Sequence, residues 1–325
     1  MNDVRDDSSF IDHRSSAVGR ILVLRLSALG DVIHTIPAVT ALKEGARVSW
    51  VVEAPYRELV EIVAGAEVIP VRMKQWARSP IASRQSMREA LRAMRGAETS
   101  IDFQGLVKSA MLGALSGAKE RIGFDKHAIR EKPALLFTNR KVHVDTTKHV
   151  IDQNLDLVWS AATQVAALDA ARKSGDLRRR IPDWETYAPR TGEPRDIVIL
   201  PGAGKPNKLW PVERWREVAK RTNAIVAWGP NERTLAEQTG ATLAPPTSLR
   251  ELAGLLRNAR LVIGADTGPL HLAAALGTRV VGLYGPTHVW RNGPYGQLDN
   301  CIQEKSMDAI SVETVMNMVE RVTAA

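Results

Sequence analysis

Residues 261–277 read LVIGADTGPLHLAAALG, a stretch that joins a short apolar run to an alanine-rich run through a turn. The run 261–264 is short, apolar and partly β-branched, which favours a buried strand. Pro269 suits the first position of a helix, and the alanines that follow it continue that helix. A strand joined to a helix by a tight turn is the repeating unit of a parallel α/β sheet, so this stretch decides the fold class.

The same alternation of strand and helix extends through the rest of the chain. In the first half the candidate strands are residues 21–26, 48–52, 68–71, 99–103 and 121–123. In the second half they are residues 196–200, 224–228, 261–264 and 279–284. The two sets predict an α/β protein with two doubly wound domains that face a central cleft, because ligands of such sheets bind at the carboxyl ends of the strands.

The length of 325 residues suits two domains of roughly 150 residues each. We expect four segments, namely a disordered tail (1–19), an N-terminal domain (20–170), a linker (171–195) and a C-terminal domain (196–325). A helix is expected over residues 148–171, and the basic, proline-interrupted composition of the following residues indicates the linker.

Composition excludes several classes of protein. No window approaches ~18 consecutive apolar residues, and the first 19 residues carry acidic side chains where an export signal is basic and then apolar, so we expect a cytoplasmic protein. Cys301 is the single cysteine, which rules out an internal disulfide framework and a site of several thiolates.

Basic residues gather in one window, residues 72–95, which holds seven basic side chains against one acidic in a chain of net charge +8. Arg84, Arg88 and Arg92 recur every fourth residue while apolar residues fall on another face, as in a basic amphipathic helix. This face could be solvated, could meet an anionic membrane surface, or could meet an anionic substrate. Nucleic acid is disfavoured because aromatic residues make up only 5% of the chain and none interleaves with these arginines.

The first strand-to-helix turn lies in residues 24–37, LRLSALGDVIHTIP. Gly30 permits a tight turn, and Asp31 stands where a helix begins. Its carboxylate could be only the N-cap of that helix. It could instead act as a general base on an acceptor hydroxyl, because this loop faces the partner domain. Pro37 predicts a kink in the helix or a late helix start.

The turn at residues 265–271, ADTGPLH, predicts an anion site. Free backbone N–H groups at a helix start, together with the helix dipole, bind a diphosphate without requiring a lysine. Pro269 has no N–H, so Thr267, Gly268 and Leu270 must supply the donors. His271 could be a buried core ring or a contact to phosphate or sugar. The chain contains neither a Walker P-loop nor a G-x-G-x-x-G fingerprint, which disfavours NTPases and dehydrogenases.

Two further turns carry candidate nucleotide contacts. Residues 201–211, PGAGKPNKLWP, place glycines beside Lys205 and Lys208, and a lysine there can neutralise the charge that grows on a departing diphosphate. Either lysine could also be a solvated loop residue. In residues 228–232, Glu232 could accept hydrogen bonds from ribose hydroxyls, although acidic helix starts after Gly-Pro turns are common.

Three stretches resemble the lipopolysaccharide heptosyltransferases, which form glycosyltransferase family 9, and the similarity runs over most of residues 20–300. They are residues 27–38 (SALGDVIHTIPA), 101–110 (IDFQGLVKSA) and 266–272 (DTGPLHL). The first and third resemble the family generally. The second, with Trp76 and residues 79–81 and 139–141, resembles its heptosyltransferase I branch. The resemblance implies the GT-B fold, with two Rossmann-like domains facing a central cleft, an N-terminal one that binds the acceptor and a C-terminal one that binds the nucleotide sugar.

The resemblance also implies a role for each matched residue. Asp31 is the implied catalytic base, and Lys208 acts at the donor phosphates. The implied donor-binding residues are Ala203, Gly204, Lys208, Glu232, Thr247, Asp266, Thr267, Gly268 and His271. The implied acceptor-binding residues are Lys74, Arg78 and Arg130. The chain departs from heptosyltransferase I at Ala203 and Gly204, where that branch has two threonines, so hydroxyl contacts to the donor phosphates are lost there.

The implied activity is inverting transfer of L-glycero-D-manno-heptose from ADP-heptose to Kdo of lipid A, in the synthesis of the lipopolysaccharide inner core. We expect no cofactor, because the ADP-sugar is a substrate, and no metal. The implied partners are the ADP-heptose donor, the Kdo-lipid A acceptor and the anionic inner face of the inner membrane. Alternatives are a related glycosyltransferase with another nucleotide sugar or lipid acceptor, a sugar-nucleotide epimerase, and a nucleotide-sugar-binding protein without turnover.

Overall fold

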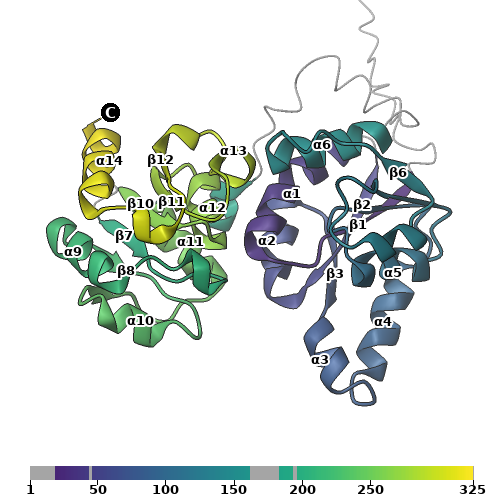
Figure 1. The fold of residues 1–325 in the computed structure, drawn as a ribbon. Coiled ribbons are helices and arrows are strands. Elements are labelled where there is room, and N and C mark those ends of the chain that lie inside the picture. Colours follow the sequence, from purple (N-terminus) through teal and green to yellow (C-terminus); the bar gives the residue numbers. More distant parts are fainter. Residues whose placement is uncertain (1–18, 44–45, 162–182, 193–195, 325) are drawn as a thin grey trace, which may run out of the picture.

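Two parallel β-sheets, each flanked by helices, make up the protein (Figure 1). The computed structural model describes residues 19–43, 46–161, 183–192 and 196–324. The N-terminal sheet has six strands in the order β3-β2-β1-β4-β5-β6, and the C-terminal sheet has six in the order β12-β11-β10-β7-β8-β9. Numbered within its own domain, each sheet has the strand order 3-2-1-4-5-6 of a Rossmann fold, so the predicted doubly wound architecture is confirmed.

The N-terminal domain is built on a sheet of short strands that are mostly buried. Its strands are β1 (Arg20–Leu24), β2 (Arg47–Glu53), β3 (Glu67–Val71), β4 (Thr99–Asp102), β5 (Glu120–Phe124) and β6 (Arg140–Val142). Its helices are α1 (Leu29–Leu42), α2 (Arg57–Leu59), α3 (Met73–Arg78), α4 (Arg84–Met94), α5 (Val107–Leu115) and α6 (Val150–Ala161). Four of the five β1 residues are buried, as expected for a strand covered on both faces.

The C-terminal domain repeats this plan. Its strands are β7 (Ile197–Leu200), β8 (Ile225–Val226), β9 (Thr242–Leu243), β10 (Leu261–Ala265), β11 (Val280–Tyr284) and β12 (Cys301–Gln303). The helices that accompany it are α8 (Trp184–Tyr187), α9 (Val212–Thr222), α10 (Arg233–Gln238), α11 (Leu249–Arg257), α12 (Gly268–Ala275), α13 (Val289–Asn292) and α14 (Val312–Ala324). Short 3-10 helices lie at Ala54–Tyr56, Lys132–Leu136, Pro206–Lys208, Leu298–Asn300 and Met307–Ala309, and a π-helix at Val60–Ala64.

Several boundaries differ from the sequence prediction. The short strands β6, β9 and β12 were not predicted, because two or three residues give no measurable alternation. Helix α1 runs through Pro37, so the late start considered for it is wrong. Residues 1–18 of the predicted tail and residues 171–182 and 193–195 of the predicted linker lie outside the described residues, and the described part of the linker contains α8. The helix expected over residues 148–171 is seen as α6, and residues 162–171 lie outside the described residues.

The two domains meet where the first turns of α1 and α12 lie against each other. A Cβ on Gly268 would lie 2.7 Å from Leu29 Cβ, and one on Gly30 would lie 2.8 Å from His271 Cδ2. Glycine at both positions therefore permits the two helices to approach. Buried residues of α1 and α12 belong to one continuous apolar cluster, so this contact is part of the hydrophobic core.

The basic window projects from the N-terminal domain as α3 and α4 (Figure 1). Met94 and Ala90 of α4 are buried against the sheet, whereas Arg84, Arg88 and Arg92 are exposed. The predicted basic amphipathic helix is therefore confirmed. None of the helices in the described part of the chain is long and apolar enough to cross a membrane.

Candidate active site

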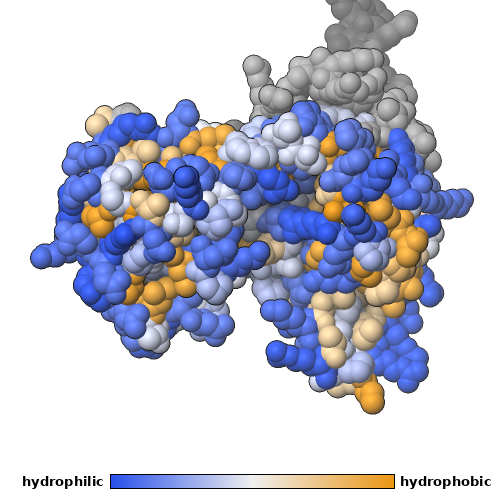
Figure 2. Space-filling model, viewed as in Figure 1, coloured by the Kyte–Doolittle hydropathy of each residue, from blue (hydrophilic) through white to orange (hydrophobic). Residues whose placement is uncertain are grey.

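A cleft of about 830 Å³ lies between the two domains, a volume typical of small-molecule sites. Residues from the carboxyl ends of both sheets line it, as the doubly wound topology predicts. Figure 2 shows the two domains as separate lobes with a hollow between them and many hydrophilic residues on the visible surface around it. The arrangement suits a polar ligand held between the domains.

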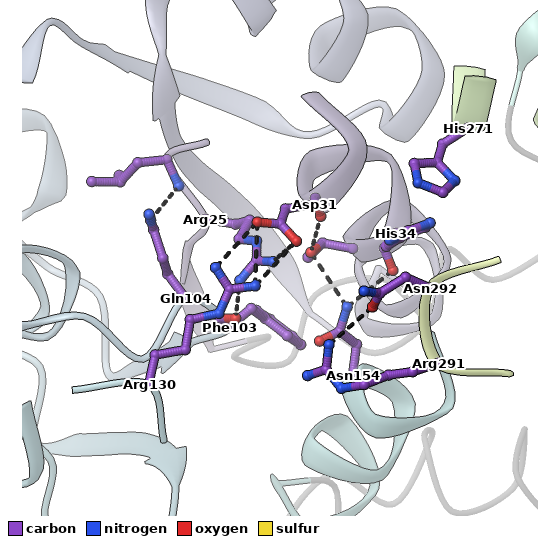
Figure 3. A network of polar contacts seen from close by, with 12 residues as sticks. Arg25, Asp31, His34, Phe103, Gln104, Arg130, Asn154, His271, Arg291 and Asn292 are labelled. Atoms are coloured by element: carbon purple, nitrogen blue, oxygen red, sulfur yellow. Dashed lines mark hydrogen bonds and ion pairs between the residues drawn. The ribbon is translucent and has the colours of Figure 1, made fainter. Parts of the chain in front are cut away.

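Asp31 lies in the first turn of α1, with its carboxylate held by two arginines (Figure 3). Arg25 Nη2 lies 2.6 Å from Asp31 Oδ1, and Arg130 Nη2 lies 3.2 Å from the same oxygen. Arg130 Nη1 also donates to Asp31 Oδ2 at 3.3 Å. The helix begins at Leu29 with Ala28 as its N-cap, so the alternative that Asp31 is the N-cap is wrong.

These arginines set the protonation state of Asp31. Burial alone would raise the pKa of this carboxyl, but the charges of Arg25 and Arg130 outweigh burial and hold its pKa below the ordinary value of 3.8. Asp31 is therefore ionised at neutral pH, as a general base must be. Its side chain keeps 24% of its surface exposed to the cleft, which leaves room for a hydroxyl to approach.

Arg25 is a functional residue that the sequence analysis missed. The residue follows β1 directly and is only 2% exposed. Its guanidinium donates to the carbonyl of Phe103, and its own carbonyl accepts from Trp50 Nε1 at 3.0 Å. The sequence did contain a signal for this residue, because Arg25 stands between two leucines at the end of an apolar strand. An arginine there is expected to be buried, and a buried cation requires an anionic partner.

The α12 turn supplies the opposite wall of the cleft. Asp266 accepts from Lys208 Nζ at 2.6 Å through Oδ2 and lies 3.0 Å from His271 Nε2 through Oδ1. Burial would raise the pKa of Asp266, but His271 and Lys208 lower it far below the ordinary value. Within the described residues, the hydroxyl of Thr267 is buried without a hydrogen-bond partner. An orphaned hydroxyl at a helix N-terminus is the kind of group that an anion satisfies.

The loop after β7 and the turn after β8 complete the C-terminal side of the cleft. Ala203, Gly204 and Lys208 line the cleft from the first, and Glu232 lines it from the second. The Glu232 Oε2 accepts from the Gly229 N–H at 2.7 Å. A Cβ on Gly202 would lie 2.1 Å from the Glu232 carboxyl, so glycine there is what permits this carboxylate to lie over the loop.

The structure does not bring every candidate residue to the cleft. Lys74 and Arg78 lie on α3 and are exposed, and Thr247 lies in the loop before α11. None of these three lines the cleft, whereas Arg130 and the remaining candidates do. Residue spacing could not show which candidates line the cleft and which do not, because the path of the loop after β5 is what brings Arg130 to Asp31.

His34 and His149 are buried close to the predicted His271, and the sequence did not point to either of them. The His34 ring lies 4.4 Å from the His271 ring and 5.6 Å from the His149 ring, measured between centroids. Burial first, and then His271 and His149, lower the pKa of His34 well below 6.5. His149 Nε2 lies 2.9 Å from the Gly293 carbonyl, and burial lowers the pKa of this ring too. The neutral ring of His149, just before α6, therefore contacts both His34 of α1 and the carbonyl of Gly293 after α13.

Fold and site together define a two-domain α/β protein in which a carboxylate faces an anion-binding helix start across one cleft. Residues 84–319 match the family described as glycosyltransferase family 9 (heptosyltransferase). Lipopolysaccharide heptosyltransferase 1 of Escherichia coli K12 is 33% identical over 86% of this chain and 91% of that protein. The Pseudomonas aeruginosa protein of the same name is 32% identical over 86% of this chain and 82% of that protein.

Solved structures agree with the sequence comparison. The E. coli heptosyltransferase WaaC with ADP superposes with a TM-score of 0.75 at 27% identity, over 93% of this chain and 99% of that one. WaaC with ADP-2-deoxy-2-fluoro heptose gives a TM-score of 0.74 at 28% identity, over the same shares. The chain belongs to glycosyltransferase family 9, the heptosyltransferase family, and is a glycosyltransferase.

Proposed function

We propose that this enzyme transfers heptose from ADP-heptose to a Kdo hydroxyl of lipid A, with inversion, in the synthesis of the lipopolysaccharide inner core. The observation that carries this proposal is the position of Asp31 across one cleft from the α12 start and Lys208. A base on one wall and an anion site on the other is the arrangement that a direct displacement requires. The names of the relatives and the ligands of the WaaC structures support the choice of donor and acceptor.

In the proposed mechanism, Asp31 accepts the proton of the acceptor hydroxyl as that oxygen attacks the anomeric carbon. The bond from that carbon to the diphosphate breaks, and negative charge grows on the departing ADP. The N–H groups at the α12 start and the ammonium of Lys208 stabilise that charge. Thr267 offers a hydroxyl to the phosphates, whereas Ala203 and Gly204 offer none.

We further propose that the reaction needs no cofactor and no metal. In the described residues, no group of three or more His, Cys, Asp or Glu side chains gathers that could hold a metal ion. Lys208 can supply the positive charge that a divalent cation supplies at other nucleotide sites. Turnover should therefore survive dialysis against EDTA, and activity that returns only with added Mg²⁺ would contradict this part of the proposal.

The decisive experiment is transfer from purified ADP-heptose to Kdo-lipid A, followed by mass spectrometry. ADP should raise the melting temperature more than UDP or GDP does at the same concentration, because ligand binding adds RT ln(1 + [L]/Kd) to stability. A preference for UDP would remove the ADP-heptose assignment. Consumption of the sugar nucleotide without an acceptor would favour an epimerase, and binding without any turnover would favour a non-catalytic protein.

We propose that the α3–α4 projection holds the enzyme at an anionic membrane surface, where the lipid acceptor resides. Ile81, between these helices, is 91% exposed, and the arginines of α4 lie beside it on the outside of the domain. An exposed apolar side chain next to a basic helix face is suited to the interface of an anionic bilayer. Lys74 and Arg78 on α3 would then meet the acceptor headgroup outside the cleft.

A further inference from the structure

Arg291 brings a third guanidinium to the cleft, from the C-terminal domain. It lies in α13, is half-buried and lines the same cavity as Asp31 and Arg130. Its Nη1 donates to the Asn292 side-chain oxygen at 2.9 Å. Within the described part of the chain, no carboxylate forms an ion pair with it. Figure 3 shows its side chain extending from the C-terminal domain toward the residues of the N-terminal domain.

The charges around Asp31 do not balance. Arg25, Arg130 and Arg291 contribute three positive charges, whereas Asp31 and the buried Asp102, which acts on Arg25, contribute two negative charges. On the donor side, Lys208 and Asp266 pair with each other at 2.6 Å. The surplus of positive charge therefore lies on the acceptor side of the cleft, and it favours an anion there.

Arg291 and Arg130 face the same space. Burial first, and then the charge of Arg130, lower the pKa of Arg291, whereas Asp31 and Asp266 oppose that shift. Among the described residues, Asp31 is the one carboxylate bonded to Arg130, and it offsets the two like charges only in part, so an anion that binds both guanidinium groups stabilises them further. Arg130 contributes from one domain and Arg291 from the other, so such an anion would also join the domains.

The backbone that carries Arg291 is fixed by contacts on several sides. The Asn292 carbonyl accepts from Tyr284 Oη at 3.3 Å, and the Val289 N–H donates to Gln303 Oε1 at 2.9 Å. The Gly293 carbonyl is bonded to His149 of the N-terminal domain. A guanidinium on such a rigid segment is preorganised for a ligand, because little backbone order has to be gained on binding.

We propose that Arg291, together with Arg130, binds the carboxylate of the acid sugar that bears the attacked hydroxyl and so positions that hydroxyl at Asp31. The inference rests on the proposed acceptor being an acid sugar. The donor diphosphate is the other anion that enters the cleft, but the α12 start and Lys208 already serve it. Arg291 is a positioning residue in this scheme, and its loss should affect use of the acceptor more than binding of ADP.

The test combines a variant with a modified acceptor. Wild type and Arg291→Leu are assayed with Kdo-lipid A and with the same acceptor whose Kdo carboxylates are converted to amides. Wild type should prefer the native acceptor by roughly tenfold to a hundredfold in kcat/KM, which is the range for a hydrogen bond to a charged group. Arg291→Leu should lose most of that preference, mainly through a higher KM for the acceptor, and Arg291→Lys should restore part of it.

A matched control separates charge from position. Arg260 is exposed and lies directly before β10, at the edge of the sheet opposite the cleft, so Arg260→Leu should leave all these parameters near wild type. Calorimetry with ADP gives a second readout, in which Arg291→Leu should bind as wild type does. Weaker ADP binding with an unchanged acceptor preference would overturn the proposal and assign Arg291 to the donor phosphates. An unchanged preference with unchanged ADP binding would overturn it outright.

Failure of the proposed function gives a different result. If wild type binds free Kdo in the presence of ADP, as followed by NMR, but transfers no heptose, the proposed reaction fails while the carboxylate site is still measured. In that case, Arg291→Leu should weaken binding of Kdo by at least about tenfold. Equal binding of Kdo by wild type and Arg291→Leu contradicts the inference whether or not transfer occurs.

Discussion

Replacing Asp31 with asparagine should abolish most turnover and also destabilise the fold. Asparagine keeps the shape of the side chain but cannot accept the acceptor proton, and general-base catalysis contributes about 10²–10⁴ in rate. The stability loss follows from Arg25, which is 2% exposed and lies 2.6 Å from the Asp31 carboxylate. Breaking a buried pair costs about 3–5 kcal/mol. Because asparagine still offers an oxygen and Asp102 also stabilises the charge of Arg25, we expect about 2–3 kcal/mol here.

Because this variant loses stability, its kinetics need a control that is equally destabilised but keeps the carboxylate. Val32, next to Asp31 in α1, is fully buried, and Val32→Ala removes two methyl groups at a cost of about 2 kcal/mol. Both variants are assayed well below their melting temperatures, with saturating ADP-heptose and Kdo-lipid A. We expect the kcat of Asp31→Asn to fall two or more decades below that of Val32→Ala, because only Asp31→Asn lacks the base, while both variants bind ADP equally.

Two outcomes would refute different steps of this argument. If turnover of Asp31→Asn lies within about fivefold of Val32→Ala, Asp31 is not the base, because the loss is far below the range for general-base catalysis. If Asp31→Asn melts at the wild-type temperature, the Arg25 pair contributes nothing measurable to the fold. The second outcome leaves the catalytic assignment intact, since rate and stability are measured separately.

Three more predictions follow from the charges in the structure. Burial raises the pKa of Asp102 to about 6 from 3.8, so the folded state holds this proton more tightly than the unfolded state does, and the stabilisation is lost as pH rises through 6. Asp102→Asn has no carboxyl to titrate, so its free energy of unfolding should not fall with pH in this way. Measured by urea unfolding, the stability of Asp102→Asn relative to wild type should rise by about 2 kcal/mol between pH 4.5 and pH 7.5. A difference that stays constant over this range would contradict the shifted pKa. Lys208→Ala should lower kcat by roughly a hundredfold in steady-state kinetics but lower the affinity for ADP by less than tenfold in calorimetry, because the charge of Lys208 matters most as the diphosphate departs. Equal losses in kcat and in ADP affinity would contradict that role. Replacing any one α4 arginine with glutamine should weaken binding to anionic vesicles, measured by sedimentation at low salt, by about fivefold. If neither salt nor the substitutions change this binding, the α4 face is only solvated surface.

The sequence was sufficient for the architecture and for the residues that lie in the two main turns. Apolar runs such as residues 261–264 correctly predicted the long central strands, because these are buried on both faces and carry a strong local signal. The edge strands β9 and β12 have two and three residues, and their pairing depends on the neighbouring strand more than on their own composition. Local pattern therefore predicts the centre of each sheet better than its edges.

The polar network could not be predicted from local pattern at all. Arg130 is separated from Asp31 by 99 residues, and Arg291 lies in a segment without any motif. Their meeting depends on how the loops after β5 and β11 pass over the cleft. Only the resemblance to the family pointed to Arg130, and neither a motif nor the resemblance pointed to Arg291.

The two arginine pairs of Asp31 differ in a way that matters for its use as a base. The Arg25 pair is 2.6 Å long and involves a side chain only 2% exposed, whereas the Arg130 pair is 3.2 Å long and its arginine is 44% exposed. An acceptor carboxylate that binds Arg130 and Arg291 competes with Asp31 for Arg130 and not for Arg25. If the ion pair between Arg130 and Asp31 weakens, the pKa of Asp31 rises, because the Arg130 guanidinium is one of the two charges that lower it. The carboxylate would then accept a proton more readily when the acceptor is bound than when the cleft is empty.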